Sequence, residues 1–256
     1  MKVEILGVRI DNVTFRQALD MVANFLRGSN PKMIATVNTE FVMMAQKDEE
    51  FKTILNHASI AVADGAGLIW ASKILKDKLP ERITGIDLVW ALAKLCEDQG
   101  LKMFLLGGLD GVAQEAAQRI KLLHPHLTIG SETGPIIDNN GNLIKTNGFT
   151  FSKIKEQMPD ILLVAFGPPK QEKFITKHLH EFGAKVVMGV GGTFDLIVSN
   201  HGRGPVWARK LGLEWVFRTI SQPKRIIRLL KSHPRFIYLV LKKKIWMMFS
   251  FDKNKK

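Results

Sequence analysis

The sequence is poor in cysteine and has no long apolar run. Its one cysteine, Cys96, excludes an intramolecular disulfide and most cysteine-based metal sites, which fits a reducing compartment such as the cytosol. No stretch reaches the ~18 consecutive apolar residues of a membrane-spanning helix, because three lysines at 242–244 interrupt the best candidate, residues 236–251. The chain opens directly on a strand pattern, so we expect no signal peptide. At most, the protein should lie on a membrane.

Several catalytic signatures are also missing. The sequence contains no Asp-x-Asp pair of the kind that holds a divalent ion in nucleotide-sugar enzymes. It has no Walker A motif, no Gly-x-Ser-x-Gly and no His-Glu-x-x-His. We therefore expect neither a bound metal nor another cofactor.

Acidic side chains are almost absent from the end of the chain. Residues 203–256 hold 15 of the 37 basic residues and only two of the 24 acidic ones, Glu214 and Asp252, so the other 202 residues carry 22 of each sign. A neutral body with a strongly basic end indicates a charged partner for that end. Phosphate backbones and anionic lipid surfaces are both candidates.

The basic end is apolar as well. It contains three of the five tryptophans and two apolar blocks at residues 236–241 and 245–251. Basic, aromatic and aliphatic residues together are typical of a surface that contacts anionic lipid. A nucleic-acid-binding protein remains the alternative, although such apolar blocks suit lipid better than a phosphate backbone.

The body alternates short apolar runs with segments of helical periodicity. Strands are expected at residues 3–6, 8–10, 33–37, 59–63, 102–106, 127–130, 161–166 and 186–190. Residues 131–148 have the composition of one long loop. The alternation predicts an α/β fold with a Rossmann-like, mostly parallel sheet and helices on both faces.

Strand patterns cease after Thr193, and prolines then punctuate the chain. Three helices are expected, over residues 205–220, 223–231 and 234–251, each with proline at its first position. We therefore divide the chain into a catalytic body, residues 1–202, and a helical basic appendage, residues 203–256.

Candidate site residues follow the strands, because ligands of open α/β sheets bind outside the carboxyl ends of the strands. The residues at these ends are Thr36, Asn38, Asp64, Gly107, Gly108, Gly167, Gln171, Gly191, Gly192 and Asp195. Glycine turns beside helix starts let backbone N–H groups approach phosphate oxygens. Together they favour a nucleotide or nucleotide-sugar site.

Three polar side chains among these residues have two interpretations each. Asp64 could be a general base that takes a proton from an attacking hydroxyl, or a helix-cap or turn aspartate. Gln171 and Asp195 could hold the base, ribose or phosphates of a nucleotide. Otherwise they are ordinary residues of a first helical turn.

Arginines in the appendage could neutralise a departing diphosphate in place of a metal. The candidates are Arg218, Arg225 and Arg228, of which the last two are spaced i,i+3 on one helical face. The other interpretation is a solvated basic face.

Five motifs together resemble the WecG/TagA/CpsF glycosyltransferases (family 26). They are residues 63–67 (Ala-Asp-Gly-Ala-Gly), 83–88 (Ile-Thr-Gly-Ile-Asp-Leu), 167–172 (Gly-Pro-Pro-Lys-Gln-Glu), 191–195 (Gly-Gly-Thr-Phe-Asp) and 213–225, which begins Leu-Glu-Trp-Val-Phe-Arg. The likeness runs from about residue 4 to 232, with the motifs in order.

The resemblance implies an inverting, metal-independent transfer of N-acetylmannosamine from its UDP-sugar donor to the GlcNAc of undecaprenyl diphosphate, as in wall teichoic acid linkage-unit synthesis. It implies that Asp64 is the base, Thr36 a pocket residue and Gln171 a donor-site residue. It further implies that Arg218, Arg225 and Arg228 close over the site from the appendage. The expected partners are the UDP-sugar, the polyprenyl-diphosphate-linked GlcNAc acceptor, the anionic inner face of the plasma membrane and a second copy of the body in a homodimer, without nucleic acid.

Two enzymatic alternatives remain. A related family member could use another UDP-sugar, such as the uronic acid UDP-ManNAcA, on a lipid-diphosphate acceptor. Residues 189–192, Gly-Val-Gly-Gly, could belong to a dinucleotide-dependent oxidoreductase. That motif falls late in the chain instead of at the first strand–helix turn, where such enzymes carry it.

Overall fold

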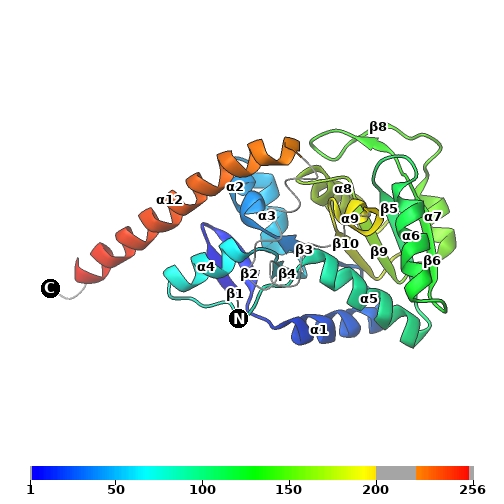
Figure 1. Ribbon diagram of the computed structural model, residues 1–256, viewed down its shortest axis with the longest axis horizontal. Coiled ribbons are helices and arrows are strands. Elements are labelled where there is room, and N and C mark those ends of the chain that lie inside the picture. Colours follow the sequence, from blue (N-terminus) through cyan, green and yellow to red (C-terminus); the bar gives the residue numbers. More distant parts are fainter. Residues whose placement is uncertain (1, 200–222, 254–256) are drawn as a thin grey trace.

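The computed structural model in Figure 1 describes residues 2–199 and 223–253, with side chains of the second range described for residues 232–249. A six-stranded parallel sheet in the order β4-β3-β10-β9-β5-β6 forms its centre. The strands are β3 (Lys32–Val37), β4 (Ile60–Ala63), β5 (Lys102–Gly107), β6 (Thr128–Glu132), β9 (Ile161–Ala165) and β10 (Val186–Gly189). The expected α/β class with a parallel sheet is confirmed.

The central strands are buried on both faces, which explains their unbroken apolar sequences. Every residue of β4, β9 and β10 is buried. One face packs against α1 (Phe15–Arg27), α5 (Gly85–Gln99), α6 (Val112–Leu123) and α9 (Thr193–Val198). The other face carries α2 (Thr39–Ala45), α3 (Glu49–His57), α4 (Ala66–Ile74), α7 (Phe151–Gln157), α8 (Lys170–His178) and the hairpin of β1 (Lys2–Ile5) and β2 (Val8–Asp11).

Side-chain caps determine where several helices begin. Thr14 accepts a hydrogen bond from the Gln17 N–H at 3.2 Å, and the Gln17 side chain accepts one from the Thr14 N–H at 2.8 Å. Thr84 caps α5 by accepting a hydrogen bond from the Asp87 N–H at 3.2 Å. Threonine is favoured at this position because its hydroxyl satisfies N–H groups that have no partner within the helix.

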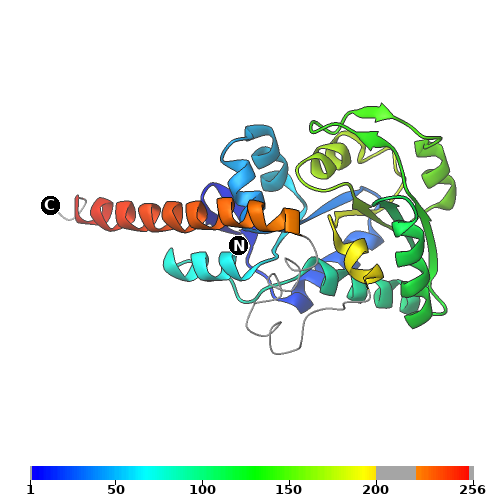
Figure 2. The ribbon, with the colours of Figure 1, turned by 45° about the horizontal axis from the view of Figure 1, so that its top comes forward.

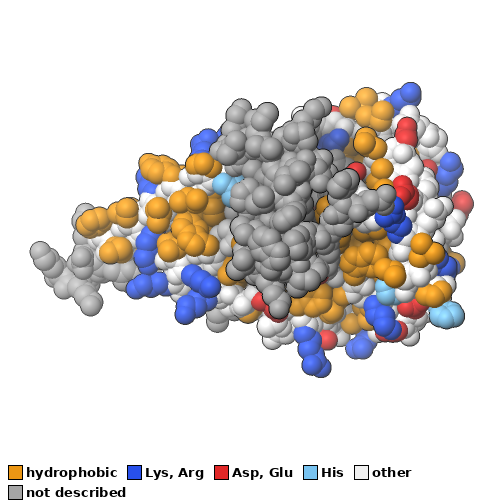
Figure 3. Space-filling model, viewed as in Figure 1, with side chains coloured by type: hydrophobic (Ala, Val, Ile, Leu, Met, Phe, Trp, Pro, Cys, Tyr) orange, Lys and Arg blue, Asp and Glu red, His pale blue; other side chains and the backbone are white. Residues whose placement is uncertain are grey.

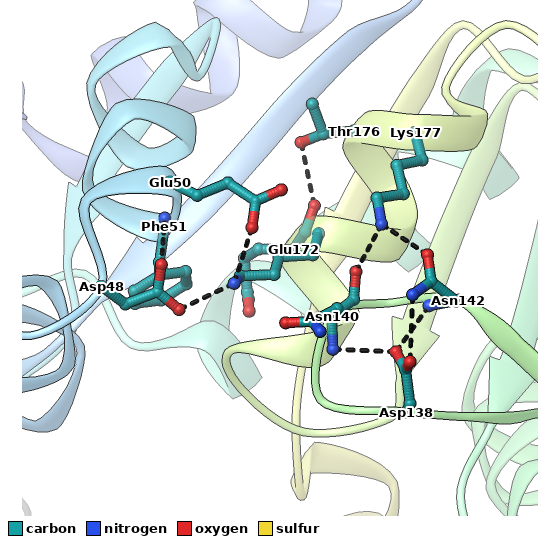
Figure 4. Close-up of polar contacts among 10 residues, drawn as sticks. Asp48, Glu50, Phe51, Asp138, Asn140, Asn142, Glu172, Thr176 and Lys177 are labelled. Atoms are coloured by element: carbon teal, nitrogen blue, oxygen red, sulfur yellow. Dashed lines mark hydrogen bonds and ion pairs between the residues drawn. The ribbon is translucent and has the colours of Figure 1, made fainter.

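The expected loop at residues 131–148 contains a small hairpin, which the sequence analysis missed. Strands β7 (Ile136–Ile137) and β8 (Leu143–Lys145) pair antiparallel. The turn between them is held by Asp138, whose Oδ1 accepts hydrogen bonds from the N–H groups of Asn140 and Asn142, each at 2.8 Å (Figure 4). Strands of two and three residues are too short to show a recognisable alternation.

The two helices expected at residues 223–231 and 234–251 are one helix, α12 (Pro223–Lys253), with Pro234 inside it. An internal proline removes one backbone hydrogen bond and costs about 3 kcal/mol. Beyond Pro234, Phe236 and Val240 are buried among apolar residues of α2 and α4, which stabilises the helix there. A proline at a helix start and one inside a packed helix look alike in the sequence. The helix expected at 205–220 lies outside the described residues.

Helix α12 begins over the body beside α2, and its carboxyl end projects beyond the body (Figures 1 and 2). Lys243 forms an ion pair with Glu4 of β1, with 3.0 Å between Nζ and Oε1. None of the helices in the described ranges combines the length and the apolar character that spanning a membrane would require.

Candidate active site

Two cavities lie at the carboxyl edge of the sheet and share a wall. The smaller, of about 170 Å³, includes residues that follow β3, β4 and β10. The larger, of about 590 Å³, includes residues that follow β5, β9 and β10. Gly167, Gly191 and Gly192 line both. The two cavities therefore form adjoining compartments at the edge where the sequence predicted a ligand site.

Asp64 and Thr36 line the smaller cavity together, as the sequence predicted. Asp64 follows β4, and its Oδ2 accepts a hydrogen bond from the Gly85 N–H at 3.2 Å. Thr36 is buried in β3 and donates its hydroxyl to the Gly189 carbonyl at 3.4 Å. A Cβ on residue 85 would lie 3.6 Å from both Asp64 Oδ2 and Thr36 Oγ1. The start of α5 at Gly85 therefore lies close to both side chains.

Asp64 is not the cap of the helix that follows it. Gly65 occupies the cap position of α4, and no side chain accepts a hydrogen bond there. The cap interpretation of Asp64 therefore fails for this helix. Its carboxylate contacts the start of α5 instead, from a cavity wall.

Gln171 connects the two glycine turns of the shared wall. Its side-chain oxygen accepts hydrogen bonds from the N–H groups of Gly167 and Gly191, each at 3.0 Å. Its Nε2 donates to Glu172 Oε1 at 2.6 Å. Gln171 is buried and lines the smaller cavity, so it positions the wall between the compartments.

Glu172 is buried beside Gln171 and is protonated at neutral pH. Burial raises the pKa of its carboxyl to about 8. Among the described residues its second oxygen, Oε2, has no hydrogen-bond partner. A Cβ on Gly189 would lie 2.8 Å from both Glu172 Oε1 and Gln171 Nε2, so the close packing of these side chains requires glycine at 189.

The glycine turns do not supply all the free N–H groups that their sequence suggested. The N–H of Gly108 donates to the Ala165 carbonyl at 2.8 Å, and those of Gly167 and Gly191 donate to Gln171. Gly107 ends β5, where a Cβ would lie 2.8 Å from the Ala165 carbonyl oxygen. Three glycine amides of the cavity walls are thus already bonded within the protein.

Asn38 and Asp195 also lie where the sequence placed them. Asn38 lines the smaller cavity and caps α2, its Oδ1 accepting from the Phe41 N–H at 3.1 Å. Asp195 lies in the first turn of α9 and lines the larger cavity. Partial burial raises the pKa of the Asp195 carboxyl.

Comparison with known sequences shows the family of this chain. The sequence profile of the Glycosyl transferase WecG/TagA/CpsF family matches residues 3–249. The chain belongs to this glycosyltransferase family. Relatives from Staphylococcus aureus strains MRSA252, MW2 and NCTC 8325 are each 36% identical to it over 245 residues, which cover 95% of this chain and 93% of theirs. Each is named N-acetylglucosaminyldiphosphoundecaprenol N-acetyl-beta-D-mannosaminyltransferase.

Three charged residues of this glycosyltransferase line the cavities without having been singled out from the sequence: Glu40, Lys170 and Asp110, which follows β5 and lines the larger cavity. Glu40, in the first turn of α2, lines the smaller cavity, and its buried Oε1 has no hydrogen-bond partner in the described part of the chain. Lys170, the first residue of α8, lines the larger cavity. All three follow strand ends, as Asn38 and Gln171 do. That position was the signal that could have found them.

The arginines expected in the site lie in the appendage. Arg218 is outside the described residues, and Arg225 and Arg228 belong to the start of α12, where side chains are not described. Farther along α12, His233 Nε2 lies 3.3 Å from the hydroxyl of Thr39, the residue after Asn38. This contact holds α12 beside the smaller cavity. No group of three or more metal-ligating side chains occurs among residues 2–199 and 232–249.

Proposed function

We propose that this glycosyltransferase moves N-acetylmannosamine from UDP-N-acetylmannosamine to the GlcNAc of GlcNAc-diphospho-undecaprenol. The names of relatives 36% identical over nearly the whole chain support this donor sugar and acceptor. The proposal rests on the position of the Asp64 carboxylate, which lines a small cavity that adjoins a larger one. The larger compartment would take the nucleotide, and the smaller would take the reacting sugars.

Asp64 acts as general base in this reaction. It takes the proton of the acceptor hydroxyl while that oxygen forms a bond to C1 of the donor sugar. The bond from C1 to the diphosphate oxygen breaks, and its electron pair leaves with UDP. One displacement from the face opposite the leaving group inverts the anomeric centre, so a single carboxylate suffices.

Cationic side chains stabilise the departing UDP. The diphosphate gains one negative charge as the C1–O bond breaks, and preorganised cations offset such charge most strongly in a site closed to water. Arg218, Arg225 and Arg228 of the appendage are the proposed cations, because arginine can bind a phosphate through two N–H groups at once. With these charges in place, the reaction needs no divalent metal.

Helix α12 supports a membrane-bound site because it is apolar on two faces. One face, with Phe236 and Val240, is buried against the body. The other exposes Ile237, Tyr238, Leu241, Ile245, Trp246, Met248 and Phe249. Figure 3 shows hydrophobic side chains along the projecting part of the helix, with lysine and arginine beside them. We propose that this face lies on the anionic inner surface of the plasma membrane, where the lipid-linked acceptor resides.

The exposed face also separates this proposal from nucleic-acid binding. A helix that binds phosphate backbones presents lysine, arginine and polar groups. The exposed face of α12 presents Trp246 and Phe249, exposed to 68% and 69%. Lipid is therefore the favoured partner. A related donor such as UDP-ManNAcA remains the second enzymatic candidate.

The proposal is tested with Asp64→Asn. The amide keeps the shape of the side chain and its hydrogen bond to Gly85 but cannot take a proton. Turnover should fall by the ~10²–10⁴-fold typical of a lost general base, while the dissociation constant for UDP stays within about twofold of wild type because UDP does not contact the base. Unchanged turnover would remove Asp64 from this role.

A further inference from the structure

Three glycine N–H groups in the wall of the larger cavity are bonded within the protein and are not available to a diphosphate. The N–H groups of Gly108, Gly167 and Gly191 donate to acceptors of the protein itself at 2.8–3.0 Å. Helix-start N–H groups and glycine turns are the usual neutral ligands of phosphate. A side-chain cation in the same wall can supply positive charge that these three bonded amides do not.

Lys170 is the one basic side chain among the described residues that lines either cavity. It is half-buried in the wall of the larger cavity, and within the described part of the chain its ammonium group makes no hydrogen bond or ion pair. Asp110 and Asp195 line the same cavity, and among the described residues no ion pair joins either of them to Lys170. The charge of Lys170 is therefore available to a ligand.

The other two lysines of α8 are engaged within the protein. Lys173 Nζ lies 2.7 Å from Asp48 Oδ2 and 2.7 Å from Glu50 Oε2. Lys177 donates to the carbonyl of Asn140 at 2.7 Å and to Asn142 Oδ1 at 2.6 Å (Figure 4). Lys170 differs from both because its charge has no described partner.

The position of Lys170 in its helix also indicates that its charge is available to an anionic ligand. It is the first residue of α8, whose cap residue Pro169 provides no side-chain hydrogen bond. A cation at a helix amino terminus is unfavourable, because the backbone dipoles place partial positive charge there. Residues that break a local rule in this way are typical of functional positions. A bound anion would turn the same placement into a favourable one.

We propose that the ammonium group of Lys170 binds the diphosphate of the nucleotide-sugar donor and of the UDP product. This inference deepens the proposed function and rests on it. As the C1–O bond breaks, its electron pair passes to the diphosphate oxygen, and Lys170 stays protonated beside the additional charge. The acceptor proton goes to Asp64, so no proton leaves Lys170. The body thereby contributes one cation to diphosphate binding, in addition to the arginines of the appendage.

Calorimetry of the full-length chain with uridine, UMP and UDP tests this role. Lys170→Met should weaken UDP binding by about 10- to 100-fold, as expected for the loss of a charge-assisted hydrogen bond. It should weaken UMP binding less and leave uridine binding within about twofold, because the nucleoside carries no phosphate. Lys170→Arg should restore most of the affinity for UDP.

Lys47→Met is the matched control, because it removes the same charge from an exposed lysine that lines neither cavity. It should bind all three ligands like the wild type. Wild-type affinity for UDP in Lys170→Met would overturn the role of Lys170 and leave the proposed function standing. A wild-type chain that does not bind UDP would overturn both.

Discussion

Gln171 has a structural role in addition to the donor contact that its sequence position predicted. It was expected to contact the donor, and it does line the smaller cavity. Its amide oxygen, however, is occupied by the N–H groups of Gly167 and Gly191, and its amide nitrogen by Glu172. The side chain therefore shapes the wall between the two compartments. The N–H groups of Gly167 and Gly191 fix its orientation, because a flipped amide would place its NH₂ against these two donors.

The burial of Glu172 makes the stability of the fold depend on pH. Its pKa is raised from 4.5 to about 8, so between these values the folded chain keeps a proton that the unfolded chain has released. A protein whose folded state binds more protons than its unfolded state loses stability as pH rises. The contribution of Glu172 to the free energy of unfolding should therefore fall from about pH 5 to pH 8 and then stay level.

Glu172→Gln should flatten this dependence. Glutamine retains an oxygen that can accept from Gln171 Nε2 but does not titrate. Urea unfolding at pH 5.5, 7 and 8.5 measures the free energy of unfolding of both proteins. The value for the variant minus that for the wild type should rise with pH, by about 1 kcal/mol or more per pH unit within this window. Glu156→Gln, at an exposed carboxyl, is the control and should leave the slope unchanged. If the free energies of unfolding of Glu172→Gln and wild type changed equally with pH, the raised pKa of Glu172 would be contradicted.

Among the elements, helix α12 has two apolar sides, one packed against the body and one exposed. Its body-facing side is fixed by Phe236, Val240, the contact of His233 with Thr39 and the ion pair of Lys243 with Glu4. Its opposite side leaves seven large apolar side chains exposed. A solvated helix is normally polar on that side. The pattern is instead that of a helix between the body and an apolar environment.

Replacing Trp246 and Phe249 together by serine should weaken binding to vesicles that contain anionic lipid. Burying a large apolar side chain contributes about 1.5–3 kcal/mol, so the partition coefficient should fall at least about tenfold. Co-sedimentation with phosphatidylglycerol vesicles measures it. Serine at Leu122 and Leu123, which are exposed to 80% and 67% on α6, provides the control and should change little. Equal loss in both double variants would argue against α12 as the lipid contact.

At the scale of the whole molecule, the sequence predicted the features that depend on local pattern. The buried strands β9 and β10, and the gathering of Thr36, Asn38, Asp64 and Asp195 at one sheet edge, follow from periodicity and parallel strands. Family resemblance added the expected chemistry.

The features that the sequence did not predict depend on contacts between distant residues. The bonds of Gln171 to Gly191 and of Gly108 to Ala165 arise only when strands far apart in the chain become neighbours. Pro234 lies within a helix because packing stabilises the turns beyond it. The missing partner of Lys170 could be recognised only after Lys173 and Lys177 were seen to have theirs.

We propose that the body and its basic helix together form one glycosyltransferase that acts on a lipid-linked sugar. The most direct test is transfer of labelled sugar by the full chain to GlcNAc-diphospho-undecaprenol in anionic vesicles, comparing UDP-ManNAc, UDP-ManNAcA and UDP-GlcNAc, with and without EDTA. We predict one N-acetylmannosamine added with inverted configuration, undiminished by EDTA and much slower with the other donors. No transfer from UDP-ManNAc, or a product that retains the configuration of the donor, would contradict the account.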